Sequence, residues 1–236
     1  MRIETSSRVN PVWAALQRKD IWGFVACVVF FILWPQTDLY VSRYFYEAQQ
    51  GFSWNEIAII GFIYRLTGVV STIILISLLV GIALSYLIKK DITRRYRKTL
   101  TYLLACFLIG PGVIVNLVLK DHWDRPRPSQ VVEFGGDHQY QAPFSPTFTC
   151  DTCHSFVSGH ASVGFYLFSI ALLFRRKRWL ALPLVAGAII GFGRITQGGH
   201  FLSDVIFSGW TVWLTTLLML SVFQLSGPLQ TAKCEN

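Results

Sequence analysis

Residues 66–88 read LTGVVSTIILISLLVGIALSYLI, an apolar run without a single charged side chain. A run of this kind is long enough to cross the hydrocarbon core of a bilayer as an α-helix, which takes about 20 residues. It is followed by the strongly basic stretch KKDITRRYRK at residues 89–98, and such stretches are typical of cytoplasmic loops. These two neighbours predict an integral membrane protein built from helices.

The composition of the whole chain agrees with this fold class. The 236 residues are 53% hydrophobic and 14% charged, with a mean hydropathy of +0.45, whereas a soluble domain carries about 25% charged residues. The length accommodates about six spans of ~20 residues with little left for a separate soluble part. We therefore expect one all-α membrane domain over residues 1–236.

Five further apolar runs supply the other expected spans. The first of them stops at Pro35 and no small-residue cleavage site follows, so we interpret it as a retained span rather than a signal peptide. The run beginning at residue 100 is interrupted by Gly110-Pro111-Gly112, which predicts a kink. The six expected transmembrane helices cover residues 21–34, 66–88, 100–119, 158–174, 179–192 and 201–225.

Residues 39–67 have a mixed, aromatic composition that does not suit a span. Tyr40, Tyr44, Phe52 and Trp54 are spread along them, and amphipathic rings favour the headgroup level of a membrane. We expect an interfacial helical segment here, after the first span.

The positive charges orient the chain. With both termini in the cytoplasm, most of the 21 Lys and Arg residues lie on the inner side, as the positive-inside rule requires. This bias explains the net charge of +8 without a nucleic-acid partner. All five histidines fall on the outer side, together with six cations: Arg43, Arg65, Lys120, Arg125, Arg127 and Arg194.

Three clusters on this outer side carry groups suited to phosphate chemistry. In the first, Lys120 and Arg127-Pro128 follow the third span. Arginine offers a planar fork of donors to phosphate oxygens and lysine adds a mobile point charge. The alternative is that these are ordinary interfacial cations that meet lipid headgroups.

The second cluster, Ser158-Gly159-His160, begins the fourth span. A helix N-terminus presents free backbone N–H groups to an anion, glycine permits a close approach, and histidine can deliver a proton. The alternative is a structural helix start with Ser158 as its cap.

The third cluster contains Arg194, His200 and Asp204. The last two are four residues apart and share one face of a helix, so the carboxylate can hold the imidazole in one tautomer and free its other nitrogen for attack. A purely structural His–Asp hydrogen bond is the alternative.

Taken in order, the three clusters resemble the signature of the type 2 phosphatidic acid phosphatase superfamily: Lys-x6-Arg-Pro, Ser-Gly-His and Arg-x5-His-x3-Asp, within residues 120–204. Two positions depart from that pattern. Val157 stands where the family usually has proline, and Gly193 stands where it usually has serine. Neither change removes a charged or proton-transferring group, although the second removes a phosphate hydrogen bond.

The resemblance implies a metal-independent hydrolysis with no cofactor. His200 would attack phosphorus to form a phosphohistidine, oriented by Asp204, while His160 protonates the leaving lipid oxygen. The phosphoryl oxygens would be held by Lys120, Arg127, Ser158, Gly159 and Arg194.

Within the superfamily, residues 38–46, 131–136 and 150–160 look like those of bacterial lipid A phosphatases. We therefore expect a lipid A 4′-phosphatase of a bacterial inner membrane, with its active site facing the periplasm. A phosphatidylglycerophosphate or undecaprenyl pyrophosphate phosphatase is the nearest alternative. A lipid phosphotransferase would carry the same motifs, and a small anion transporter is a further class.

Several outer-side residues have no place in the signature. Cys150 and Cys153 could form a disulfide in an oxidising compartment, or contribute to a zinc site with His154 for which no fourth ligand is evident. Asp38 and Arg65 are interpreted as interfacial anchors, and the family pattern does not require Arg125.

Overall fold

A computed structural model describes residues 19–88, 91–146, 150, 153–174 and 177–225. This part of the chain is helical and contains no β-strand, so the all-α prediction holds for it. Its helices, with the π-helix η2 and the short 3-10 helices η1 and η3–η6, have the following bounds: α2 Lys19–Leu33, α3 Thr37–Arg43, η1 Ser53–Glu56, α4 Ala58–Leu87, α5 Asp91–Phe107, η2 Leu108–Leu119, α6 Lys120–Trp123, η3 Pro128–Gln130, η4 Val132–Phe134, α7 Gly159–Phe165, α8 Leu167–Ala171, η5 Leu172–Phe174, η6 Lys177–Leu180, α9 Ala181–Thr196 and α10 Leu202–Val222.

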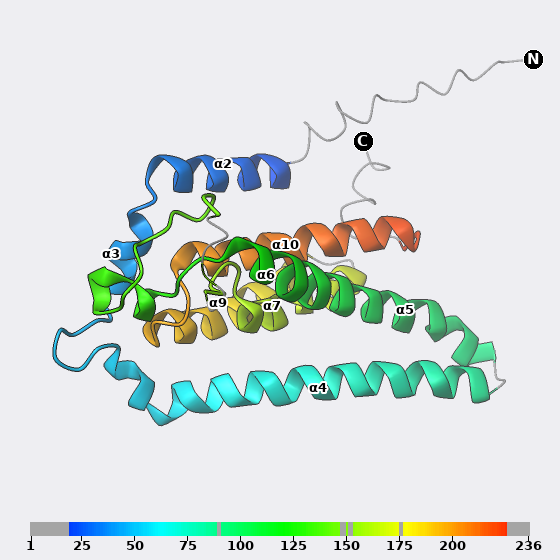
Figure 1. The fold of residues 1–236 in the computed structure, drawn as a ribbon. Coiled ribbons are helices and arrows are strands. Elements are labelled where there is room, and N and C mark those ends of the chain that lie inside the picture. The colour runs from blue at the N-terminus through cyan, green and yellow to red at the C-terminus, as the bar shows by residue number, and fades with distance from the viewer. Residues whose placement is uncertain (1–18, 89–90, 147–149, 151–152, 175–176, 226–236) are drawn as a thin grey trace, which may run out of the picture.

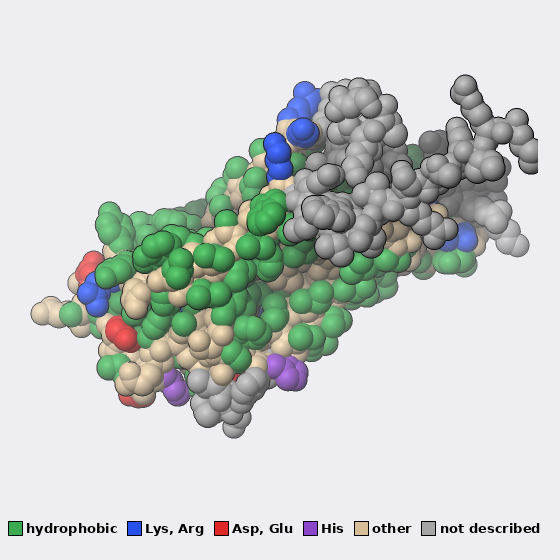
Figure 2. Space-filling model, turned by 90° about the horizontal axis from the view of Figure 1, so that it is seen from above, with side chains coloured by type: hydrophobic (Ala, Val, Ile, Leu, Met, Phe, Trp, Pro, Cys, Tyr) green, Lys and Arg blue, Asp and Glu red, His purple; other side chains and the backbone are tan. Residues whose placement is uncertain are grey.

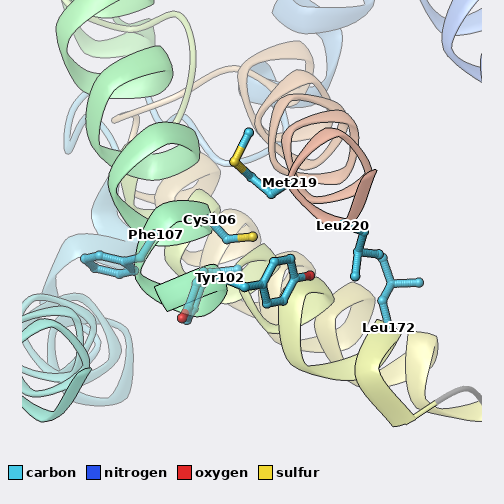
Figure 3. Close-up of a cluster of buried hydrophobic side chains, with 7 residues drawn as sticks. Tyr102, Cys106, Phe107, Leu172, Met219 and Leu220 are labelled. Carbon is cyan, nitrogen blue, oxygen red and sulfur yellow. The ribbon is translucent and has the colours of Figure 1, made fainter. Parts of the chain in front are cut away.

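The long helices lie side by side, and their outer connections gather with α3 at one end of the bundle (Figure 1). The junction of α4 with α5 lies at the opposite end. A buried cluster in the inner part of the bundle joins α5, η5 and α10 through Tyr102, Cys106, Leu172 and Met219 (Figure 3). The segments that carry the three motifs are thus anchored to one packed body.

The expected six spans are present only in part. Among the described residues, four helical segments are long and apolar enough to cross a membrane: Ala58–Leu87, Tyr96–Leu119, Lys177–Thr196 and Leu202–Val222. The first expected span is a broken one, because α2 and α3 meet at an angle of 80°. The fourth, Gly159–Phe174, is apolar but shorter than a span. The protein is a multi-pass membrane protein whose described residues contain four candidate spans, or five if the bent pair of α2 and α3 is one span.

The second span begins earlier than the sequence predicted. Residues 58–65 were assigned to an interfacial segment, but α4 continues through them as regular helix. The mixed composition of this stretch is also compatible with a helix end that emerges from the hydrocarbon, because amphipathic side chains such as Tyr64 and Arg65 are favourable there. Only α3 and η1 remain as short helices in the expected interfacial segment.

The break after α2 occurs at Pro35, which lacks a backbone N–H and so cannot continue the hydrogen-bond ladder. The kink expected at Pro111 takes the form of a π-helix, η2. There the side-chain amide of Asn116 donates to the backbone oxygen of Pro111, five residues earlier, at 2.6 Å. The sequence therefore located both irregularities, although not their form.

The outer surface of the bundle is apolar. Figure 2 shows hydrophobic side chains over long stretches of one face, and α4 in particular leaves Ile73, Ile76, Leu79 and Val80 about half exposed. Exposed apolar area of this extent is what lipid chains would cover.

Candidate active site

The first two motifs meet at Gly159. Lys120 opens α6 directly after η2, and Gly159 opens α7. A Cβ atom on Gly159 would lie 3.0 Å from Lys120 Nζ and 2.8 Å from Asn116 Oδ1. The absence of a side chain at Gly159 therefore lets the Lys120 ammonium lie directly against the start of α7.

Ser158 has the structural role that the sequence offered as an alternative. Its Oγ accepts a hydrogen bond from the N–H of Ala161 at 3.3 Å, so it is the N-cap of α7. Its backbone N–H donates to the oxygen of Asp204 at 3.1 Å, and Ser208 Oγ donates to its carbonyl at 2.9 Å. The second motif is thereby fastened to α10, which carries the third.

The loop between α9 and α10 folds back on Arg194. The N–H groups of Gly199 and His200 both donate to the Arg194 carbonyl, at 2.9 and 3.3 Å. A Cβ on Gly199 would lie 2.2 Å from Arg194 Nη2, so only glycine lets the guanidinium lie flat against this turn. Arg194 Nη1 also donates to Gln197 Oε1.

His200 is almost fully buried and has a defined tautomer. Its Nδ1 lies 2.8 Å from the backbone oxygen of Ser155, and because a carbonyl only accepts, Nδ1 carries the proton. The lone pair is then on Nε2. Burial lowers the pKa of His200 to about 4, with Asp204 opposing that shift and the charges of Arg194 and Lys120 adding to it. The imidazole is neutral at neutral pH, as a nucleophile must be.

Asp204 supports this imidazole differently from the prediction. Its Oδ2 lies 3.6 Å from His200 Nδ1, beyond an ordinary hydrogen bond. The carboxylate instead accepts from Ser155 Oγ at 2.5 Å and from the N–H of Phe201 at 2.8 Å. Ser155 therefore fixes both partners, one with its hydroxyl and the other with its carbonyl, and it was not among the predicted site residues.

Arg125 lies behind Asp204 and is completely buried. Its Nη1 donates to Asp204 Oδ1 at 2.5 Å and its Nη2 donates to Asp38 Oδ2 at 2.7 Å. Burial would lower the pKa of Arg125, but the carboxylates of Asp204 and Asp38 raise it above its usual value. The interpretation of Asp38 as an interfacial anchor is wrong, because its side chain has no exposed surface.

The phosphate-binding candidates converge on His160. Its electrostatic neighbours are Arg194, Lys120, Arg127 and His200. The Nε atoms of Arg127 and Arg194 are buried and have no hydrogen-bond partner within the described residues. Buried guanidinium donors of this kind are suited to an anion.

Tyr64 of α4 completes this group and was also missed by sequence reasoning. Its ring stacks on His160 with centroids 4.4 Å apart and an interplanar angle of 23°. Arg194 Cζ lies 4.7 Å from the centre of the same ring. A single tyrosine thus contacts two of the predicted site residues. A tyrosine among the other aromatic residues of this region gives no distinctive sequence signal.

The arrangement brings together all eight residues that the signature predicted, from three separate segments of the chain. The PAP2 superfamily matches residues 99–228, a stretch that contains the three motifs. The chain belongs to the PAP2 superfamily. The family predicted from the motifs is therefore confirmed.

Curated relatives of this PAP2 protein extend the similarity over most of its length. A lipid A 4′-phosphatase of Francisella tularensis subsp. novicida (strain U112) is 38% identical over 213 residues, covering 86% of this chain and 94% of the relative. A lipid A 4′-phosphatase of Rhizobium leguminosarum is 30% identical over 219 residues, covering 85% of this chain and 91% of the relative. No solved structure matches significantly.

The PAP2 match begins at residue 99, so Asp38 and Tyr64 lie outside it. Both nevertheless contact residues of the site, Asp38 through Arg125 and Tyr64 directly. Part of this PAP2 site is therefore supplied by helices that precede the family region.

The cysteine pair of the outer loop forms a disulfide, Cys150–Cys153, one of the two alternatives left open by the sequence. The histidine beside it is His138, whose Nε2 lies 4.0 Å from Cys150 Sγ. His154 turns instead toward the carbonyl of Lys120, with Nδ1 at 3.1 Å. The disulfide is thus the arrangement found, and the alternative of a zinc site with His154 is not.

Proposed function

We propose that this PAP2 protein removes the 4′-phosphate of lipid A by way of a phosphohistidine. Its enzyme class, a phosphoric monoester hydrolase acting on lipid, follows from the family and from relatives that are lipid A 4′-phosphatases. The observation that carries the mechanism is the geometry of His200: Nδ1 is committed to Ser155 and Nε2 bears the lone pair.

In the first step, Nε2 of His200 attacks phosphorus while the bond from phosphorus to the lipid oxygen breaks. The leaving oxygen takes a proton from His160, which must enter the step protonated. The phosphoryl oxygens are neutralised by Lys120, Arg127 and Arg194. The imidazole ring becomes cationic because Nδ1 keeps its proton, and the Asp204 carboxylate at 3.6 Å stabilises that charge.

In the second step, water attacks phosphorus and gives a proton to His160, which is now neutral. The nitrogen–phosphorus bond breaks, its electron pair returns to Nε2, and inorganic phosphate leaves. Every proton-transferring and charge-neutralising group in this cycle is a side chain of the protein. The cycle accordingly needs neither a metal nor a cofactor.

The outer, periplasmic side is the proposed location of the site. The first residues of α5, which belong to the basic stretch of the sequence, lie at the opposite end of the bundle from the connections that carry the motifs, in keeping with the positive-inside rule. The Cys150–Cys153 disulfide beside the second motif supports the same assignment, because disulfides persist in oxidising compartments. The substrate would be a lipid of the inner membrane.

The test is phosphate release by the purified protein in detergent with EDTA present. Lipid A, phosphatidylglycerophosphate and undecaprenyl pyrophosphate are compared, and mass spectrometry identifies which phosphate of lipid A is lost. We expect loss from the 4′ position alone, abolished by His200→Ala. The matched control is His122→Ala, which removes an exposed histidine and should leave the rate unchanged.

Other results would redirect the proposal. Release only from another lipid changes the substrate but keeps the mechanism. Appearance of a second phosphate on an acceptor lipid identifies a phosphotransferase. Full activity in His200→Ala, or activity that EDTA abolishes, contradicts the phosphohistidine mechanism.

A further inference from the structure

Asp38 makes an unusual set of contacts for a residue outside the PAP2 signature. It lies in the first turn of α3, after the 80° bend, and its side chain is fully buried. Oδ1 accepts from the backbone N–H of Ser203 at 2.8 Å, and Oδ2 accepts from Ser203 Oγ at 2.5 Å. Asp38 thus binds the first turn of α10, where free N–H groups and the helix dipole favour a carboxylate.

The same carboxylate shares Arg125 with Asp204. Arg125 donates to Asp38 through Nη2 and to Asp204 through Nη1. The carbonyl of Arg125 accepts from the N–H of Ser155 at 2.9 Å. Arg125 therefore fixes both Asp204 and Ser155, which surround His200, and Asp38 holds the far side of the guanidinium.

The charges of this buried group do not cancel. One guanidinium faces two carboxyl groups beside a neutral His200, so with both of them ionised Asp38, Arg125 and Asp204 together carry a net negative charge. If Asp38 were absent, Arg125 would be paired with Asp204 alone and would neutralise it. The negative charge available to a cationic imidazole would then largely disappear.

We propose that Asp38 is a positioning residue of the reaction, which engages Arg125 so that the Asp204 carboxylate stays fixed and electrostatically available to His200. This inference rests on the proposed phosphohistidine function. Asp38 does not touch the substrate; it acts through Arg125. Its contribution is greatest when His200 becomes cationic, because the positive charge of the imidazole then offsets the net negative charge of Asp38, Arg125 and Asp204.

The first arm of the test does not depend on activity. Thermal unfolding in detergent is measured for Asp38→Asn, Asp204→Asn and the double variant. Each single variant leaves Arg125 with one carboxylate, whereas the double variant leaves a buried guanidinium with neither. We expect the double variant to lose clearly more in Tm than the sum of the single losses. Additive losses would overturn the proposal, whether or not any lipid is hydrolysed.

The second arm measures kinetics per active site, with sites counted from the trapped phosphoenzyme. Asp38→Asn should lower kcat about 10- to 100-fold, the range expected when a reacting group loses its precise support, with little change in KM. The matched control is Asp20→Asn, also in the first broken segment and also bonded to α10, through Trp213 Nε1 at 3.0 Å. Trp213 lies nine residues beyond Asp204, about 13 Å along the helix, so this variant should keep the wild-type kcat.

The pH profile separates positioning from a merely structural role. His200 faces Asp204, Arg194, Lys120 and His160, together with the carbonyl of Ser155. Removing the negative charge of Asp38 makes protonation of His200 less favourable, so its pKa falls and the acid limb of kcat/KM moves to lower pH. A variant with wild-type kcat per site and an unmoved acid limb would overturn the proposal. A wild-type protein that hydrolyses no lipid would instead refute the proposed function. The thermal unfolding of the single and double variants would then still test whether Asp38 and Asp204 are coupled through Arg125.

Discussion

The two ring nitrogens of His200 have different surroundings: Nδ1 is hydrogen-bonded to the backbone of Ser155, and Nε2 carries the lone pair that the proposed mechanism uses. The backbone carbonyl of Ser155 accepts the hydrogen bond from Nδ1, so substitution of the Ser155 side chain does not remove this acceptor. The hydroxyl of the same residue holds Asp204. At this scale the site depends on backbone geometry as much as on the charged side chains of the motifs.

The acid limb of the wild-type pH profile follows from the burial of His200. Its pKa is lowered from 6.5 to about 4, so the neutral form predominates above that pH and is lost as the pH falls through it. We expect kcat/KM to be insensitive to His200 protonation between pH 7 and 5 and to decrease near pH 4. A pH series on one lipid checks this, and an acid limb centred at pH 6.5 would contradict it.

Gly159 provides a test of the contact between the first two motifs. Gly159→Ala places a Cβ 3.0 Å from Lys120 Nζ and so displaces the ammonium. Weakening one charge-assisted hydrogen bond to phosphate costs about 1.5–3 kcal/mol, which lowers kcat/KM by about 10- to 100-fold. Steady-state kinetics measure this. Gly68→Ala is the control, since nothing lies within 4 Å of its Cβ; equal effects of the two changes would contradict the interpretation.

Among the elements, α4 has a part in the site that its apolar sequence hides. Most of its length faces outward, yet its outer end carries Tyr64 against His160 and Arg194. The inner end of the same helix has a comparable pair, because Arg97 Cζ lies 3.7 Å from the ring centre of Tyr86. One helix thus offers two tyrosine–arginine contacts, and only one of them lies at the site.

Because α4 has two such tyrosine–arginine contacts, substitution of Tyr86 serves as the matched control for substitution of Tyr64. Tyr64→Ala removes the stacking on His160 and the contact with the Arg194 guanidinium, together worth about 1–3 kcal/mol. We expect kcat/KM to fall about tenfold or more, with Tyr64→Phe retaining most of the activity because the ring remains. Tyr86→Ala should leave the kinetics unchanged. Loss of activity in Tyr64→Phe would point to the hydroxyl group instead.

There is a physical reason why the sequence predicted the positions of some elements correctly and of others incorrectly. Long apolar runs located α5 with η2, α9 and α10, because lipid-facing composition is a property of a whole segment. The start of α4 was missed, and the 80° angle of the break at Pro35 was not predicted, since each depends on a few residues at a helix end. Boundaries carry little compositional signal.

The residues of the site likewise fall into those that the sequence predicted and those that it did not. The groups of the three motifs were predicted because each motif has a recognisable spacing. Asp38, Arg125 and Ser155 were not, although they are among the most buried polar residues. Asp38 and Arg125 pair across 87 positions of sequence, and two single charges so far apart give no pattern until the fold brings them together.

At the scale of the whole molecule, the proposed orientation has a direct test. Ser129 is exposed in the outer connection and Tyr96 is exposed near the opposite end of the bundle. In a Cys234→Ser background, Ser129→Cys should react with a membrane-impermeant maleimide on intact cells whose outer membrane has been made permeable. Tyr96→Cys should react only after the inner membrane is opened. The reverse pattern would place the site in the cytoplasm.

The sharp turn between α2 and α3 also determines which segments of this protein must stay together in a chimera with another protein. Residues 99–228 look like a self-sufficient module, since they contain every signature group. The turn brings Asp38 into contact with Arg125, which lies behind Asp204 within the family region. A chimera that joined this module to an unrelated N-terminal half would inherit all three motifs and still bury Arg125 without its second carboxylate. Inheritance of the motifs alone should therefore not transfer full activity, and the N-terminal helices must be exchanged together with the module they complete.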